Sequence, residues 1–381
     1  MGALALPPAS RVPMQPTPSI LGQTLAQFTP AARAAGAPAV EVAPVFRTFH
    51  RTGVLPDPTP AWVADERLPL GAVQVEGQTL KFTLRLPNGL ETESVVIPML
   101  HRTGRASRTL CVSSQVGCAM GCRFCETAQM GLLHSLSAAH IVAQLHAARF
   151  LVENPFEGGR GFAIKNIVFM GMGEPMDNLD AVMQAIRVMA DPNAYAIPPS
   201  NIAVSTVGRT DGIRRFGELV SEHGFHRLNL AVSLNAPNDA IRTQIMPIAR
   251  SEPLDTLMAA LLAFPKRPNA AICVEYVLIP GVNDALEHCD EVCRLLKPLR
   301  CSLNVIPYNP RRNSPWPAPT EEGVQAWVDR AVQNCQFCKR RGTKGRSVMA
   351  ACGQLGSERI RQRRFVDSGQ PVSVNIRANA S

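Results

Sequence analysis

Three cysteines, Cys118, Cys122 and Cys125, stand close together in one short stretch, with Gly117 before them and Gly131 after them. Glycines at such positions are typical of an irregular loop, in which neighbouring thiolates can converge on one small inorganic group. Structural zinc usually takes four protein ligands, and a conventional iron–sulfur cluster takes four cysteines. Because no fourth cysteine stands nearby, the spacing indicates a cubane 4Fe–4S cluster with one open iron, where a small molecule can bind and react.

Two alternatives remain open for this stretch. The thiols could form a redox-inert group, or they could bind zinc together with a residue from a distant part of the chain. The residues at the ends of the strands predicted downstream favour the cluster.

Predicted strands and helices alternate along the chain, and they must position the cysteine loop. Strands are predicted at 109–113, 165–171, 201–206, 227–233, 271–278 and 302–307, and helices at 137–152, 179–190, 211–223, 254–264 and 285–296. The alternation predicts βα units with right-handed crossovers, and therefore an α/β fold with a partial (β/α)6 barrel of the TIM type. In such barrels the chemistry lies on loops after the carboxyl ends of the strands. The cysteine loop follows the first strand and is correctly placed.

Polar groups and glycines also follow the later strands. Gly173 lets the backbone approach a ligand closely, and Glu174 can receive an ammonium group. Hydroxyl and amide groups that suit a carboxylate, a ribose or an adenine stand at Ser205, at Ser233-Leu234-Asn235 and at Asn309. Serine and asparagine also favour strand ends for turn geometry alone, but four such positions at successive strand ends favour a binding site.

Composition and charge restrict the class of protein. The chain has 381 residues, eleven cysteines and a net charge of +9, which indicates a polyanionic partner. The odd cysteine count and the start of the chain, which does not resemble a signal peptide, predict reduced thiols in the cytoplasm rather than a disulfide framework. No uncharged apolar window approaches the roughly 18 residues of a membrane span, so no membrane partner is expected.

The sequence divides into five predicted segments. They are a disordered proline-rich leader at 1–28, a small N-terminal lobe with a hairpin at 29–98, the barrel at 99–312, a basic extension carrying Cys352 at 313–368, and a disordered tail at 369–381. Residues 339–364 of the extension contain nine lysines and arginines against one glutamate. Positive charge at this density is typical of nucleic-acid binding, although a solvated basic face is the ordinary alternative.

The hairpin carries a candidate proton acceptor. Apolar residues alternate with polar ones from Leu80 to Leu86, and Pro87-Asn88-Gly89 supplies the turn. On the return strand Glu93 shares its parity with Val95 and Ile97, which predicts a carboxylate on an apolar face, where desolvation would make it a better base. On periodicity alone, an edge residue near solvent is the favoured interpretation.

Three motifs together resemble one family. The run at 110–118, the turn Gly173-Glu174-Pro175 and the run at 350–355 (Ala-Ala-Cys-Gly-Gln-Leu) are similar to those of the RlmN/Cfr family. Members are radical S-adenosylmethionine (SAM) methyltransferases that methylate an adenine ring carbon in RNA. The resemblance covers roughly residues 78–365 and is faint in the N-terminal lobe.

The resemblance implies a mechanism, and the protein is expected to be a cytoplasmic monomer. Cys118, Cys122 and Cys125 would ligate the 4Fe–4S cluster. Two SAM molecules would be used per turnover: one would methylate Cys352, and the other would yield the radical that activates this methyl group. Glu93 would accept the proton of the ring carbon, and Cys111 would release the product through a transient disulfide with Cys352. SAM would contact Gly173, Glu174, Ser205, Ser233, Leu234, Asn235 and Asn309.

The implied partners are RNA and an electron donor such as flavodoxin or ferredoxin. C2 of adenine in large-subunit rRNA is the expected target, with tRNA as a second substrate. C8, another RNA, or a non-catalytic iron–sulfur protein that binds RNA or senses redox state remain as alternatives. The sequence departs from the family at Glu126, usually a small residue, and at 344–349, which has lost acidic residues. Cys289 and Cys293, one helical turn apart, and the pair Cys335 and Cys338 are expected to be structural.

Overall fold

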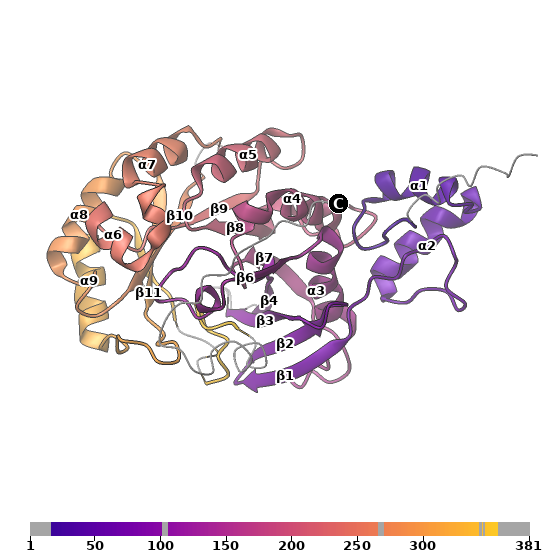
Figure 1. Cartoon of the computed structure of the whole chain (residues 1–381), viewed down its shortest axis with the longest axis horizontal. Coiled ribbons are helices and arrows are strands. Elements are labelled where there is room, and N and C mark those ends of the chain that lie inside the picture. Colours follow the sequence, from indigo (N-terminus) through magenta and orange to yellow (C-terminus); the bar gives the residue numbers. More distant parts are fainter. Residues whose placement is uncertain (1–16, 101–105, 266–269, 343–344, 346, 357–381) are drawn as a thin grey trace, which may run out of the picture.

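A ten-stranded sheet organises the chain, in the order β1-β2-β3-β4-β7-β8-β9-β10-β11-β12 (Figure 1). The computed structural model describes residues 17–100, 106–265, 270–342, 345 and 347–356. Strands β4 to β11 of this sheet pair in parallel, as the predicted βα alternation requires. Their bounds are β4 Ala106–Cys111, β7 Ile164–Phe169, β8 Ile202–Thr206, β9 Asn229–Ser233, β10 Ile272–Leu278 and β11 Cys301–Pro307.

Helices cover the outer face of the parallel strands (Figure 1). They are α3 Ala138–Phe150, α4 Leu179–Ala190, α5 Thr210–Ser221, α6 Asp239–Ile245, α7 Leu254–Ala263, α8 Leu286–Leu296 and α9 Glu321–Gln333. Ser137 caps α3 by accepting a hydrogen bond from the His140 N–H, which satisfies one of the free donors of the first turn. The α/β fold and its parallel sheet of the partial TIM type are confirmed.

The predicted hairpin extends the barrel sheet. Strand β2 (Thr79–Arg85) pairs antiparallel with β3 (Glu91–Leu100), and β3 pairs antiparallel with β4. Gly89 has a φ of 79°, which the turn requires and which glycine adopts without strain. A further strand, β1 (Leu70–Glu76), which the sequence analysis did not predict, forms the outer edge beyond β2.

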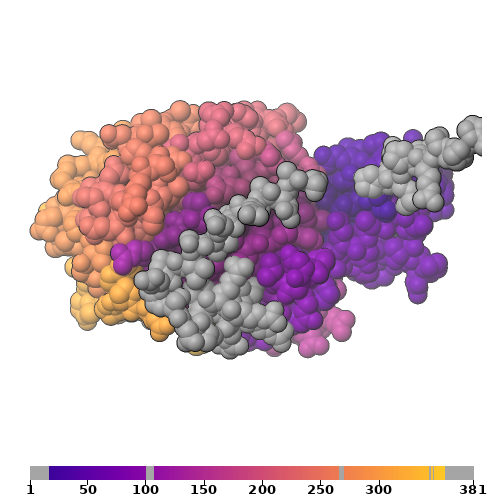
Figure 2. Space-filling model, in the orientation of Figure 1, coloured from indigo at the N-terminus to yellow at the C-terminus, as the bar shows by residue number. Residues whose placement is uncertain are grey.

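Two helices, α1 (Leu25–Ala34) and α2 (Ala39–Thr52), form a lobe beside the barrel; Figure 2 shows it in indigo and violet against one side of the body. The Phe49 ring of α2 stacks on the His146 ring of α3 at 4.8 Å between centroids. The predicted leader boundary at residue 28 is wrong, because Ile20 and Leu21 are fully buried and α1 begins at Leu25. Residues 1–16 and the predicted tail at 369–381 lie outside the described residues.

The C-terminal extension adds a last strand and then returns over the barrel. After α9, whose Trp327 ring stacks on Tyr276 at 4.9 Å, β12 (Cys338–Arg340) pairs in parallel with β11. Residues 347–356 then approach the carboxyl ends of the barrel strands, where they border the cavity described below. Within the described parts of the chain, no helix has the length and apolarity that crossing a membrane requires.

Candidate active site

The cysteine loop leaves the carboxyl end of β4. A small sheet of β5 (Gln115–Gly117) and β6 (Leu132–Ser135) closes the loop, and the Cys118 N–H donates to the Gly131 carbonyl at 2.9 Å. Gly117 has a φ of 77°, and a Cβ at this position would lie 1.9 Å from the Gly131 oxygen. The glycines beside the cysteines therefore fix the backbone of the loop.

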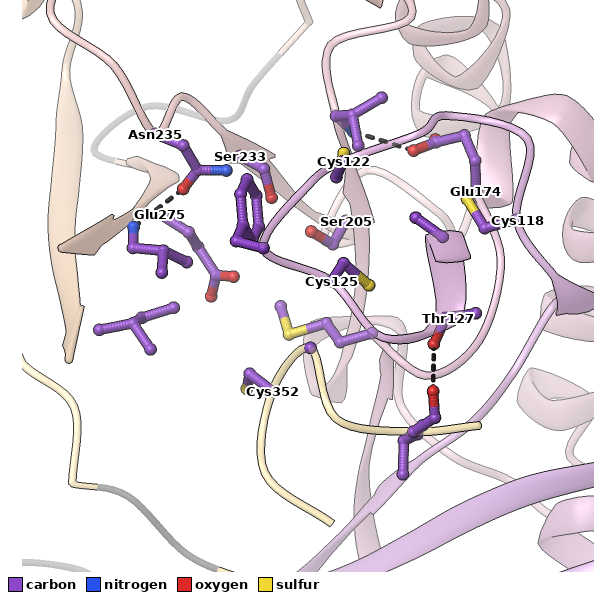
Figure 3. Close-up of a pocket in the computed structure, with 18 of the residues that line it drawn as sticks. Cys118, Cys122, Cys125, Thr127, Glu174, Ser205, Ser233, Asn235, Glu275 and Cys352 are labelled. Carbon is purple, nitrogen blue, oxygen red and sulfur yellow. Dashed lines mark hydrogen bonds between the residues drawn. The ribbon is translucent and has the colours of Figure 1, made fainter. Parts of the chain in front are cut away.

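The three cysteines line one cavity at the carboxyl ends of the strands (Figure 3). Cys118 and Cys122 are buried, and Cys125 is half-buried. Burial raises the pKa of all three thiols, and the charges of the neighbouring cysteines raise the pKa of Cys122 further. The thiolate forms therefore need a strong cation, which iron supplies.

The donor set of three cysteine thiols fits a cubane cluster. Among the residues that the structure describes, no group of three or more His, Cys, Asp or Glu is arranged to hold one metal ion, as a zinc site would be. In a cubane the three thiolates bind three different iron atoms and do not have to converge on one point. Three cysteines that line one cavity meet that requirement.

Glu174 lies at the carboxyl end of β7 in the same cavity. Burial raises the pKa of Glu174 to about 7, although hydrogen bonds from backbone donors lower this pKa in part. Its two oxygens accept from the Met176 N–H at 3.0 Å and from the Val207 N–H at 2.9 Å. A carboxylate that is 2% exposed and open to a cavity is suited to an ammonium ligand, which would favour its charged form.

Gly173 is required for this arrangement. Its φ is 98°, and a Cβ there would lie 2.6 Å from the Gln115 Cβ. The Gln115 side-chain oxygen accepts from the Glu174 N–H at 2.9 Å, so the cysteine loop and the glutamate turn are in direct contact.

The remaining strand-end positions border the cavity with one exception. Ser205, Ser233, Asn235 and Asn309 line it. Asn235 has a φ of 56°, and its side-chain oxygen accepts from the Val277 N–H at 2.9 Å, which fixes its orientation. The Leu234 side chain is 1% exposed and belongs to the hydrophobic core. The structure therefore brings together every predicted SAM-binding side chain except that of Leu234.

Cys352, near the end of the chain, borders the same cavity as Cys118, Cys122 and Cys125, which we call the cluster cavity. Its side chain is exposed and borders both this cavity and an adjoining one lined by Ile97 and Arg341; Figure 3 shows Cys125, Glu275 and Cys352 around the same opening. The Thr127 hydroxyl, two residues after Cys125, donates to the Leu355 carbonyl at 2.6 Å. The Cys352 segment is thus hydrogen-bonded directly to the cysteine loop.

Cys111 is the last residue of β4 and is buried. Burial raises its pKa to about 12, and the charge of a Cys352 thiolate contributes to the shift. Cys111 does not line the cluster cavity. The electrostatic coupling of the two cysteines shows that the structure brings them into the same neighbourhood.

Two charged residues at this place were not predicted. The Arg341 guanidinium donates to the Glu275 carboxylate at 2.7 Å, and its charge favours the thiolates of Cys352 and Cys111. Although Cys352 keeps contact with solvent, the surrounding protein removes water from its thiol, and this desolvation raises the pKa of Cys352. In the sequence Arg341 belongs to the basic run of the extension, and Glu275 lies in an apolar strand. The sequence contained one signal for this ion pair: Glu275 places a carboxylate inside a predicted central strand, and a buried carboxylate needs a partner.

Glu93 contacts residue Gly356 in the segment at 347–356, which carries Cys352. Its carboxylate is 3% exposed, so the edge interpretation is wrong. It accepts from the Gly356 N–H at 3.1 Å and lies 3.7 Å from the Lys81 ammonium. The cavity that it lines also contains Arg85 and Arg312 and is separate from the cluster cavity.

The remaining predictions concern single side chains. The departure at Glu126 has a structural role, since its carboxylate accepts from the Arg312 N–H at 3.1 Å. Cys289 is buried on α8, and its thiol donates to the Trp327 carbonyl at 3.5 Å, which fits helix packing. Cys335 is exposed, and Cys338 is half-buried on β12. Of the nine basic residues at 339–364, only those at 339–341 lie among the described residues.

Known proteins share this sequence and architecture. The family model of the radical SAM superfamily matches residues 112–296. A probable dual-specificity RNA methyltransferase RlmN 1 of Protochlamydia amoebophila is 39% identical over 297 residues, 78% of each chain. The dual-specificity RNA methyltransferase RlmN of Syntrophobacter fumaroxidans is 41% identical over 287 residues, 75% of this chain and 78% of that protein.

A solved structure extends the likeness to the fold. The crystal structure of a radical SAM methyltransferase from Sphaerobacter thermophilus superposes with a TM-score of 0.77 and 32% identity, covering 88% of this chain and 98% of that one. Membership of the superfamily implies a 4Fe–4S cluster and SAM, which the cavity fits. The chain belongs to the RlmN family of radical SAM methyltransferases.

Proposed function

We propose that this enzyme methylates C2 of an adenine in RNA, with large-subunit rRNA as the principal substrate and tRNA as a second one. The names of its relatives support RNA as the substrate class. The observation that carries the proposal is the position of Cys352, which borders the same cavity as the three cluster cysteines and Glu174.

The residues of the cavity divide between the two cofactors. Cys118, Cys122 and Cys125 would hold the cluster, and Glu174 would receive the ammonium group of SAM. When bound, the cluster and two SAM molecules per turnover supply first a methyl group and then a 5′-deoxyadenosyl radical. An adenine ring carbon is too weak a nucleophile for direct methyl transfer, which is why a covalent route is required.

Cys352 is the proposed methyl carrier. Its thiolate would take the methyl group, and after hydrogen abstraction from that group the carbon would bond to the base. The Arg341 charge favours the thiolate against the effect of burial. The segment's hydrogen bonds to the cysteine loop keep the sulfur at the cavity during both stages.

Two further residues complete the transfer. Glu93 would take the proton from the ring carbon of the radical adduct, and the unpaired electron would leave for an acceptor such as the cluster or the electron-transfer partner. The Cys111 thiolate would then attack the Cys352 sulfur, which forms the S–S bond and breaks the S–C bond. The released CH2 group would take a proton and become the methyl group of the base. Reduction of the disulfide in the cytoplasm resets the enzyme. Lys81, Arg85 and Arg312 surround Glu93 in its cavity, and such cations suit the phosphates of an RNA strand.

The test is anaerobic reconstitution of the protein as a monomer, with reduced flavodoxin or ferredoxin as electron donor. The protein is then incubated with SAM and unmodified rRNA or tRNA. We expect 2-methyladenosine, 5′-deoxyadenosine and S-adenosylhomocysteine. 8-Methyladenosine would move the reaction to C8. RNA binding with intact SAM would indicate a non-catalytic iron–sulfur protein.

A further inference from the structure

The buried lysine Lys81 contacts both Glu93 and the segment at 347–356 that carries Cys352. Lys81 on β2 and Glu93 on β3 lie on the same face of the hairpin, because Glu93 is paired with Thr83, two residues from Lys81. The Lys81 ammonium lies 3.7 Å from the Glu93 carboxylate. The lysine is 7% exposed and the glutamate 3%, so neither charge is well solvated.

The same two side chains contact the Cys352 segment on both sides of the cysteine. The Lys81 ammonium donates to the Met349 carbonyl at 3.4 Å. The Glu93 oxygen that faces Lys81 also accepts from the Gly356 N–H at 3.1 Å. One buried ion pair therefore holds the backbone before and after Cys352.

We propose that Lys81 is a positioning residue for the methyl transfer: it keeps Glu93 ionised and holds the Cys352 segment beside it. The inference rests on the proposed function, in which Glu93 accepts the proton of the ring carbon. A buried carboxylate without a cation favours its neutral form, which cannot accept a proton.

The geometry also links proton transfer to movement of the segment. When Glu93 takes the proton, it loses its negative charge and its ionic attraction to the Lys81 ammonium. The Gly356 N–H then donates to a neutral acceptor, and such a hydrogen bond is weaker than one to a charged carboxylate. The segment is then held less firmly, at the stage when Cys352 has to react with Cys111. Among the described residues that line the same cavity, the other charged groups are Arg312 and the ion pair of Arg85 and Glu91, at 3.8 Å.

The experiment compares Lys81→Met and Lys81→Arg with the wild-type enzyme, reconstituted with its cluster and assayed for RNA methylation across pH. We expect Lys81→Met to lower the rate about tenfold or more, with the rising limb of the pH profile moved to higher pH, because Glu93 now ionises less readily. Lys81→Arg keeps a cation and should leave the profile near that of the wild type. Lys165→Met, an exposed lysine on β7, is the matched control and should change neither.

Two results would overturn the inference. One is a Lys81→Met enzyme with the wild-type rate and profile. The other is a loss that is equal at every pH and has no recovery in Lys81→Arg, which would make Lys81 a structural residue only.

Folding is tested separately with a double variant. If Lys81→Met is unstable, Lys81→Met with Glu93→Gln should recover thermal stability, because it leaves no unpaired buried charge; no recovery would contradict the ion pair. Glu93→Gln alone distinguishes the two proposals. Wild-type methylation by Glu93→Gln would refute the proposed role of Glu93, whereas an inactive Glu93→Gln beside a fully active Lys81→Met would refute only the role of Lys81.

Discussion

The Glu126 N–H donates to the Gly353 carbonyl at 2.7 Å. Glu126 follows the last cluster cysteine, and Gly353 follows Cys352, so this hydrogen bond joins the two chemical motifs of the chain through their adjacent residues. It explains how a cysteine near the end of the sequence is presented to a cavity built mainly by the barrel.

Removing the Thr127 hydroxyl should weaken this docking. Thr127→Val keeps the shape of the side chain but loses the hydrogen bond to the Leu355 carbonyl, and a buried acceptor left unpaired costs about 1–3 kcal/mol. We expect slower S-methylation of Cys352, measured by mass spectrometry of the protein. Cluster absorbance is recorded beside it, because burial raises the pKa of the Cys125 thiol and the Thr127 side chain lowers it in part. Ser221→Ala, which removes a hydroxyl from the remote helix α5, is the control. An unchanged rate of S-methylation in Thr127→Val would refute the role of this contact.

Gly173→Ala should abolish SAM binding. An alanine there meets two penalties, a left-handed φ and a Cβ 2.6 Å from the Gln115 Cβ. Gly224→Ala is the matched control, because Gly224 has a φ of 91° but a Cβ added there would meet nothing within 4 Å. The strain of a left-handed alanine alone costs about 1–2 kcal/mol. Equilibrium dialysis with SAM should show loss of binding in Gly173→Ala only; equal SAM affinity in both variants would show that the contact with Gln115 is unimportant.

Glu174 should make stability and SAM binding depend on pH in opposite directions. Its folded pKa of about 7 lies above the ordinary value of 4.5. The folded protein therefore binds more protons than the unfolded one between these values, and stability present below pH 4.5 is lost as the pH rises through 7. The loss is about 3 kcal/mol at most.

Binding of SAM, whose ammonium group favours the carboxylate, should instead become tighter as the pH rises through 7. Denaturant unfolding and SAM titration at pH 5.5 and 8 check both effects. Glu174→Gln should remove both. If this variant keeps the pH dependence of the wild type, another group is responsible.

Arg341→Met should be destabilising because it leaves the buried Glu275 carboxylate without its cation. The Arg341 side chain is 34% exposed, so solvent screening keeps the cost below the roughly 3–5 kcal/mol of a fully buried pair. Arg341→Met with Glu275→Gln should recover most of that stability. The double variant should still methylate Cys352 more slowly, because the Arg341 charge lowers the pKa of this thiol more than the Glu275 charge raises it, and both charges are removed. Thermal unfolding and the rate of S-methylation give the two readouts. A double variant with the wild-type rate at every pH would exclude an electrostatic role.

Patterns local to the sequence predicted much of the fold and the site. Alternation identified the hairpin strands, and Pro87-Asn88-Gly89 identified their turn, because side-chain periodicity follows directly from strand geometry. The strand-end positions of Glu174 and Asn235 were predicted because the carboxyl ends of parallel strands meet at one rim.

Contacts between distant segments could not be predicted in the same way. The return of residues 347–356 over the barrel depends on hydrogen bonds of backbone groups, such as the Gly353 carbonyl, which every sequence possesses. Arg341 was indistinguishable from the neighbouring basic residues, since only the fold shows that it faces Glu275. Leu234 was assigned to the ligand as part of the run Ser233-Leu234-Asn235 at a predicted strand end, but its side chain alternates into the core.

The most direct test of the account is methyl transfer by Cys352→Ala. Wild-type protein and the variant, both with rebuilt clusters, are incubated with SAM carrying a deuterated methyl group and with unmodified RNA, and protein and nucleosides are analysed by mass spectrometry. Cys335→Ala, which removes an exposed cysteine of the same extension, is the control. The account predicts a labelled Cys352 and labelled adenine with wild type and control, and no labelled adenine with Cys352→Ala despite an intact cluster. Labelled adenine formed by Cys352→Ala at the wild-type rate would contradict it.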